Sequence, residues 1–163
     1  MVFFHGGLSS HRFWKHWFIP RLPDSIVDKH HIIAPDLLGF GESPAPAELL
    51  FTMEHHLQFL EHSLIEQRNL QSIHLFGYSV GAIVAVAFAA RHPERMKSLR
   101  LFSVPHFETA SEADAHLVKL RFSMYMMRVL YCVCVCMCGT CISVCVAIVE
   151  CGLTNSLWCS PSL

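Results

Sequence analysis

The stretch that decides the fold is IHLFGYSVGAIVAVAFAA, residues 73–90 of a 163-residue chain. The short apolar run Ile73–Phe76 predicts a buried strand. Residues 77–81, Gly-Tyr-Ser-Val-Gly, predict a sharp turn. Residues 82–90 are apolar on every side, which predicts a buried helix. A strand, a tight turn and a buried helix in direct succession indicate an α/β unit.

Strands and helices alternate on both sides of this unit. Apolar runs predict further strands at residues 2–4, 31–34 and 99–104. The intervening patterns predict a short helix at 9–18 and an amphipathic helix at 52–68, which Thr52 can cap. This order predicts a mostly parallel sheet covered by helices, an α/β architecture.

Composition excludes several classes of protein. The chain is 53% hydrophobic and 15% charged, with a net charge of −1, which excludes a disordered chain and argues against a nucleic-acid partner. Its size fits one domain with a stable core. No basic leader precedes the apolar run at Val2, so no signal peptide is predicted. Location stays open: the default is cytoplasmic, while a longer parent protein could be membrane-bound or extracellular.

The motif Gly77-x-Ser79-x-Gly81 lies between a predicted strand and a predicted helix. This is the setting of a nucleophile elbow, in which a strained turn lifts the serine hydroxyl above the sheet. Glycines flank the serine because side chains at 77 and 81 would clash in so tight a turn. The alternative is a glycine-rich turn that only packs closely.

Two further segments follow predicted strands. His5-Gly6-Gly7 is expected to lie beside the elbow, where backbone N–H groups of Gly7 and Val80 can face a developing oxyanion. The alternative is a glycine turn without a ligand. Asp36 ends another strand, and we expect it to fix the following loop through backbone N–H groups, with a catalytic role as the alternative.

Together, the segments VFFHGGLSS (2–10), IIAPDLLGFGESP (32–44) and IHLFGYSVGAIVAVAFAARHPERMKSLRLFSVP (73–105) resemble the α/β-hydrolase superfamily over residues 2–107. The segment DLLGFGESP is most similar to the plant branch that includes the BODYGUARD-type hydrolases. The resemblance implies an incomplete sheet of α/β-hydrolase type.

For the site, the resemblance implies Ser79 as nucleophile and Gly7 and Val80 as oxyanion donors, with His5, Gly6 and Asp36 in support. It implies no cofactor, and a small-molecule or lipid-like ester as substrate. A serine in place of an aspartate argues against the haloalkane dehalogenase and epoxide hydrolase branches.

The chain departs from the family after the elbow. In this family an acid and then a histidine follow the serine, but only His92, His106 and His116 follow Ser79, and residues 121–163 contain no Asp or His. We therefore expect a hydrolase core cut at both ends and inactive through loss of the triad acid and histidine. The alternative is a non-catalytic, membrane-tethered or partner-binding fragment of the same fold.

Three parts of the chain are expected: a partial core at 1–107, the start of a cap at 108–124, and a Cys/Val-rich tail at 125–163. All eight cysteines lie in the tail. The tail is interpreted as a translated simple repeat, with a membrane span over the uncharged residues 129–149 and a metal–thiolate cluster as alternatives.

No metal site is predicted elsewhere in the chain, because no H-E-x-x-H motif or paired C-x-x-C motif occurs. Three histidines fall on the amphipathic helix: His55, His56 and His62. They are expected to lie on its solvated face.

Overall fold

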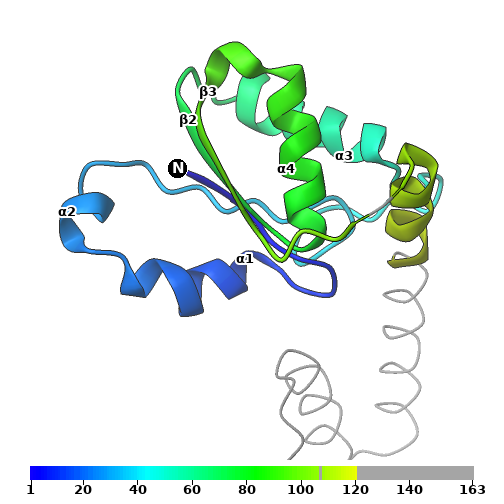
Figure 1. Ribbon diagram of the computed structural model, residues 1–163, viewed down its shortest axis with the longest axis horizontal. Coiled ribbons are helices and arrows are strands. Elements are labelled where there is room, and N and C mark those ends of the chain that lie inside the picture. The colour runs from blue at the N-terminus through cyan, green and yellow to red at the C-terminus, as the bar shows by residue number, and fades with distance from the viewer. Residues whose placement is uncertain (107, 121–163) are drawn as a thin grey trace, which may run out of the picture. The chain divides into compact units, whose positions relative to one another are not determined.

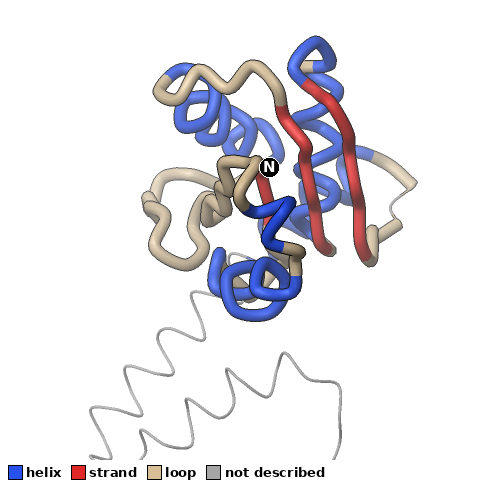
Figure 2. The backbone as a smooth tube through the Cα atoms, turned by 90° about the vertical axis from the view of Figure 1, so that its left-hand side faces the viewer, coloured by secondary structure: helices blue, strands red, loops and turns tan. Residues whose placement is uncertain are grey.

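A parallel sheet forms the centre of the computed structural model, which describes residues 1–106 and 108–120. Its strands are β1 (Val2–Phe4), β2 (Ile73–Tyr78) and β3 (Met96–Phe102), in the order β1-β2-β3 (Figure 2). The α/β architecture predicted from the sequence is thereby confirmed. The tail from residue 125 onward, including residues 129–149 for which a membrane span was the alternative interpretation, lies outside the described residues.

Helical segments connect and cover the strands (Figure 1). They are α1 (His11–Phe13), the π-helix η1 (Trp14–Phe18), the 3-10 helix η2 (Ile19–Arg21), α2 (Asp24–Val27), α3 (Met53–Leu60), the π-helix η3 (Glu61–Glu66), α4 (Val80–Arg91) and the 3-10 helix η4 (Pro93–Arg95). The last helix within the described residues runs over 110–120. Within the described residues, no helix is both long and apolar enough to cross a bilayer.

Helical segments pack on both faces of the sheet at β1 and β2, whose successive side chains point to opposite sides, whereas β3 is largely exposed. Phe4 of β1 meets Phe88 of α4 on one side, with ring centroids 5.8 Å apart. Phe3 faces the other side, where it stacks on Phe76 of β2 at 4.4 Å and contacts Trp14 of η1 at 5.1 Å. The five rings therefore anchor α4 and the α1–η1 segment to opposite faces of one sheet.

The strand predicted at residues 31–34 is reduced to one bridge. Ile33 pairs with Val2 in parallel register, and Phe3 N–H donates to the Ile33 carbonyl at 2.9 Å. Pro35, two residues after Ile33, has no N–H to continue the ladder, so the pairing stops there. The chain after this bridge nevertheless places Asp36 at the same edge of the sheet as the end of β1.

The predicted amphipathic helix exists, but its histidines do not share one face. Leu57, Leu60 and Leu64 are buried as its apolar stripe requires. His62 is exposed, whereas His56 is fully buried, so the expectation that His56 lies on the solvated face is wrong. His56 precedes Leu60 by one helical turn, which places both residues on the core side.

Candidate active site

Ser79 has a strained backbone in the turn between β2 and α4. Ser79 adopts φ +52° and ψ −121°, a conformation that residues with a side chain rarely adopt. The turn is held on both sides: Ser79 N–H donates to the Phe102 carbonyl, and Ala82 N–H donates to the Ser79 carbonyl, each at 2.9 Å. The end of β3 and the start of α4 thus hold Ser79 in the strained conformation.

The two flanking glycines leave room for this turn. A Cβ on Gly77 would lie 2.6 Å from Ala82 Cα, and a Cβ on Gly81 would lie 2.5 Å from the Phe4 carbonyl oxygen, with the His5 carbonyl also in its way. These neighbours are backbone atoms that cannot move aside. Gly81 therefore lets the first turn of α4 approach the end of β1 closely.

The loop after β1 lies against the elbow. A Cβ on Gly6 would be 3.2 Å from Ser79 Cβ and 2.9 Å from Tyr78 Cδ1, and a Cβ on Gly7 would be 3.5 Å from Val80 Cγ2. The structure therefore brings His5-Gly6-Gly7 and Ser79-Val80 together, as the sequence predicts. Val80 is the first residue of α4, where an N–H has no acceptor within the helix.

The buried His5 side chain orients the Gly6–Gly7 peptide through a hydrogen bond. Its side chain is fully buried; Nε2 accepts from Leu37 N–H at 3.0 Å, so Nδ1 carries the proton and donates to the Gly6 carbonyl at 2.7 Å. In a planar trans peptide the N–H points away from the carbonyl. The Gly7 N–H therefore points away from the His5 ring.

Charge at His5 is disfavoured in this position. Burial lowers the pKa of His5, while the Gly6 carbonyl and the nearby Asp36 carboxylate partly oppose the shift. The neutral ring is the form that can accept from Leu37 and donate to Gly6 at the same time.

Asp36 holds three segments together at the edge of the sheet. Its carboxylate accepts the backbone N–H groups of His11 and of Glu42, the latter at 2.8 Å, and contacts His11 Nδ1 at 3.0 Å. Ser43 Oγ donates to the Asp36 carbonyl at 2.7 Å. These are the contacts of a carboxylate that fixes a loop.

The same contacts govern the ionisation of Asp36. Burial by itself would raise the pKa of Asp36, but the hydrogen bonds from Glu42 and His11 hold it below its ordinary value. Asp36 is thus ionised at neutral pH and available to all its donors.

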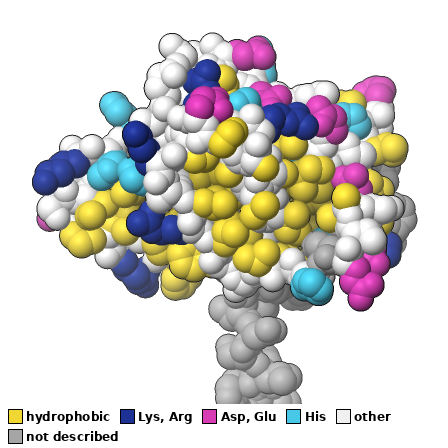
Figure 3. Space-filling model, turned by 45° about the horizontal axis from the view of Figure 1, so that its top comes forward, with side chains coloured by type: hydrophobic (Ala, Val, Ile, Leu, Met, Phe, Trp, Pro, Cys, Tyr) yellow, Lys and Arg dark blue, Asp and Glu magenta, His cyan; other side chains and the backbone are white. Residues whose placement is uncertain are grey.

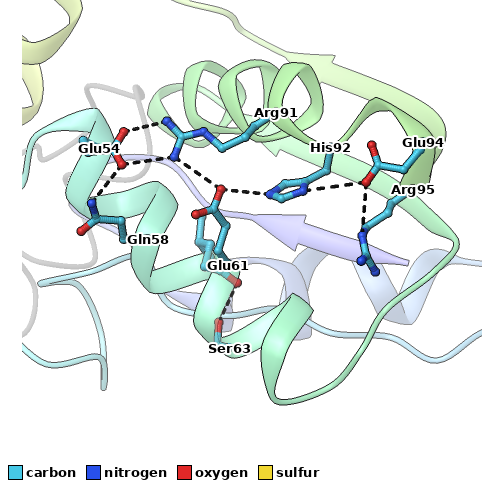
Figure 4. A network of polar contacts seen from close by, with 9 residues as sticks. Glu54, Gln58, Glu61, Ser63, Arg91, His92, Glu94 and Arg95 are labelled. Atoms are coloured by element: carbon cyan, nitrogen blue, oxygen red, sulfur yellow. Dashed lines mark hydrogen bonds and ion pairs between the residues drawn. The ribbon is translucent and has the colours of Figure 1, made fainter.

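No histidine in the described residues is hydrogen-bonded to the Ser79 hydroxyl. His92 lies at the opposite end of α4 from Ser79, where its Nε2 contacts Glu61 at 3.0 Å and its Nδ1 contacts Glu94 at 4.0 Å (Figure 4). His106 is exposed, and His116 lies on the last helix. The described part of the chain therefore brings the strained turn at Ser79 and the glycine loop together, without a histidine hydrogen-bonded to the serine hydroxyl.

Sequence reasoning missed contacts made by two side chains near the site. Asp114, from the last helix, accepts Met53 N–H at 2.8 Å and so satisfies a free donor at the start of α3. His11 pairs with Asp36, a contact that sequence spacing does not reveal because 25 residues separate them. Among the described residues, no group of three His, Cys, Asp or Glu side chains is arranged to hold a metal ion.

Comparison with known proteins agrees with this geometry. Residues 1–127 match the family described as alpha/beta hydrolase fold. The chain is 42% identical over 107 residues to the Arabidopsis thaliana protein named "Probable lysophospholipase BODYGUARD 1", covering 66% of this chain and 23% of that protein. It is 40% identical over 85 residues to Lipase 1 of Psychrobacter immobilis, covering 52% and 26% of the two chains.

A solved structure of an esterase also resembles the chain. An esterase from a marine microorganism superposes with a TM-score of 0.54 at 25% identity, over 71% of this chain and 42% of the esterase. The chain spans about a quarter of the length of the curated relatives named above. The match over residues 1–127 and the parallel sheet lead to one conclusion: this chain belongs to the α/β-hydrolase family.

Proposed function

We propose that the chain carries the nucleophile and oxyanion-binding half of a serine hydrolase that cleaves a carboxylic ester of a lipid-like substrate. The observation that carries the proposal is the strained Ser79, with φ +52°, beside the Gly6–Gly7 loop. The lysophospholipase and lipase names of its relatives favour a lipid ester over other acyl substrates.

The proposed reaction uses each of these groups in turn. The Ser79 hydroxyl attacks the ester carbonyl while a base takes its proton, and the base returns this proton to the oxygen of the departing alcohol. Water then hydrolyses the acyl-enzyme, which releases the carboxylic acid and restores the Ser79 hydroxyl. The N–H groups of Gly7 and Val80 stabilise the oxyanion of each tetrahedral intermediate. His5 orients the Gly7 peptide, and Asp36 holds the loops that support it.

Turnover by the 163 residues alone is expected to be slow. Among the described residues no histidine is joined to Ser79, so the proton of the hydroxyl has no prepared acceptor. A serine hydroxyl without a base to accept its proton is a weak nucleophile. We expect a rate only slightly above that of buffer, and one that depends on the Ser79 hydroxyl.

The test is hydrolysis of a p-nitrophenyl ester by the purified chain and by two variants. Ser79→Ala should reduce the rate to that of buffer, whereas Ser25→Ala, at an exposed serine of α2, should leave it unchanged. Equal rates for Ser79→Ala and the unsubstituted chain would overturn the proposal and favour a non-catalytic, partner-binding fragment.

A further inference from the structure

The helical run over α1, η1 and η2 is firmly attached to the sheet on its inner side. Trp14 is fully buried there, and Phe13 stacks on Tyr78 at 5.0 Å, next to the elbow serine. Phe18 contacts Phe3 at 5.9 Å. The outer side of the run is therefore presented in a fixed orientation.

The outer side combines an exposed indole ring with basic side chains. Trp17 is 62% exposed, the largest value among the exposed large apolar side chains of the described residues. The Arg21 guanidinium lies 5.7 Å from the centre of its ring and also donates to the Trp17 carbonyl. Lys15 and His16 are exposed beside them. A tryptophan flanked by long cationic side chains is the composition of a segment that lies in a lipid–water interface.

Charge is distributed unevenly around this segment. Residues 8–23 contain no Asp or Glu, and within the described part of the chain Lys15 forms no ion pair. Arg12 does form one, with Glu42 at 3.7 Å, but both side chains are largely exposed.

The same asymmetry is visible on the surface. In Figure 3, Lys, Arg and His side chains gather with apolar ones at the left-hand end, the end occupied by α1 and α2 in Figure 1. Most of the Asp and Glu side chains visible in this view lie toward the top and right, although exposed Asp24 of α2 and Asp28 follow the basic segment in sequence. The excess of Lys and Arg over acidic residues within residues 8–23 matches a surface of negative charge.

We propose that the outer side of residues 12–21 docks on a lipid surface that carries anionic headgroups. Trp17 enters the boundary between headgroups and acyl chains, while Lys15 and Arg21 pair with the anionic headgroups. Because Phe13 stacks on Tyr78, docking holds the elbow close to the lipid layer. The inference extends the proposed function, but it concerns binding and does not require Ser79 to react.

The test is co-sedimentation of the full chain with vesicles of phosphatidylcholine, alone or mixed with phosphatidylglycerol. The chain should prefer the mixed vesicles by at least about tenfold, and added salt should weaken this preference. The double variant Lys15→Glu/Arg21→Glu should lose about 25-fold in binding to the mixed vesicles, or about fivefold for each cation removed. Trp17→Ala should lose about tenfold.

A matched control separates this segment from overall charge and from the uncharged residues 129–149. Arg68→Glu/Lys97→Glu changes the net charge equally at exposed positions outside the segment, and should lose less than about threefold. Far-ultraviolet circular dichroism verifies that each variant is folded. Equal binding by the two double variants, or equal binding of the unsubstituted chain to both kinds of vesicle, would overturn the proposal.

Discussion

At the scale of single residues, Ser79 shows strain concentrated at one position. A residue with a side chain at φ +52° is destabilised by about 1–3 kcal/mol relative to a relaxed conformation. Glycine adopts this conformation without that penalty. The strain is therefore a property of the side chain at residue 79 in this turn.

This strain gives a prediction about stability. Ser79→Gly should be more stable than Ser79→Ala by about 1 kcal/mol, because alanine retains the Cβ and glycine does not. Both variants lack the hydroxyl, so the difference isolates the backbone. Urea denaturation followed by circular dichroism measures it. A Ser79→Gly variant less stable than Ser79→Ala would show that residue 79 is not strained as described.

His56 makes the stability of the chain depend on pH. Neither ring nitrogen has a hydrogen-bond partner in the described structure, and burial lowers the pKa of His56 to about 4. The unfolded chain binds this proton near pH 6.5, before the folded chain does. The contribution of His56 is therefore complete above about pH 6.5 and falls as the pH drops toward 4, by at most about 3 kcal/mol.

The measurement is the free energy of unfolding between pH 7 and 4. His56→Phe should flatten the slope in this range, whereas His16→Gln, at an exposed histidine, should leave it as it is. The remaining slope belongs to other groups, among them His5, whose pKa burial also lowers. If His56→Phe and the unsubstituted chain lose stability in parallel, His56 is not buried as a neutral ring.

At the scale of elements, the contact between α4 and the end of β1 is set by one glycine. The position of a Cβ on Gly81 overlaps the backbone of Phe4 and His5. Gly81→Ala should therefore destabilise the chain by more than about 2 kcal/mol, although alanine favours a helix by about 1 kcal/mol.

The matched control for Gly81→Ala is on the same helix. Ala90→Gly, at the exposed end of α4, should lose only about 1 kcal/mol, from helix propensity alone. Thermal denaturation of the three proteins compares the effects. A Gly81→Ala variant as stable as the unsubstituted chain would mean that α4 does not approach β1 so closely.

The η1 segment offers a second comparison within one element. Trp14→Ala should destabilise the chain by about 3–5 kcal/mol, since it empties the space between Phe3 and Phe18. Trp17→Ala, three residues further on, should change stability by less than about 0.5 kcal/mol because its ring is mostly in solvent. Guanidinium denaturation distinguishes the two. Equal losses would contradict the assignment of an inner and an outer side.

At the scale of the whole molecule, the sequence predicted the elements and the turn that depend mainly on residues close together in the chain. The alternation of apolar runs predicted β1, β2 and α4, and the spacing of Gly77, Ser79 and Gly81 predicted the strained turn. The sequence could not place His56, because its burial depends on the loop at Phe40 and Phe51, whose rings lie 6.4 Å from it. It also could not pair His11 with Asp36, since that contact exists only after the strands align.

Ion pairs between elements are a second kind of contact that the sequence does not reveal. Arg91 at the end of α4 contacts Glu54 of α3 at 2.6 Å and Glu61 of η3 at 3.4 Å (Figure 4). The sequence analysis did not predict these pairs, because they join residues at least 30 positions apart. Their side chains are partly exposed, so solvent screens them, and the apolar contacts between the elements contribute more to the fold.

The most direct test of Ser79 as nucleophile is its reaction with a fluorophosphonate, located by mass spectrometry of peptides. The account predicts one covalent adduct on the peptide that contains Ser79, formed slowly because no histidine is joined to this serine, in both the unsubstituted chain and Ser25→Ala, and none in Ser79→Ala. An adduct that persists in Ser79→Ala, or no adduct in a chain shown to be folded, would contradict the assignment of Ser79 as the reactive serine.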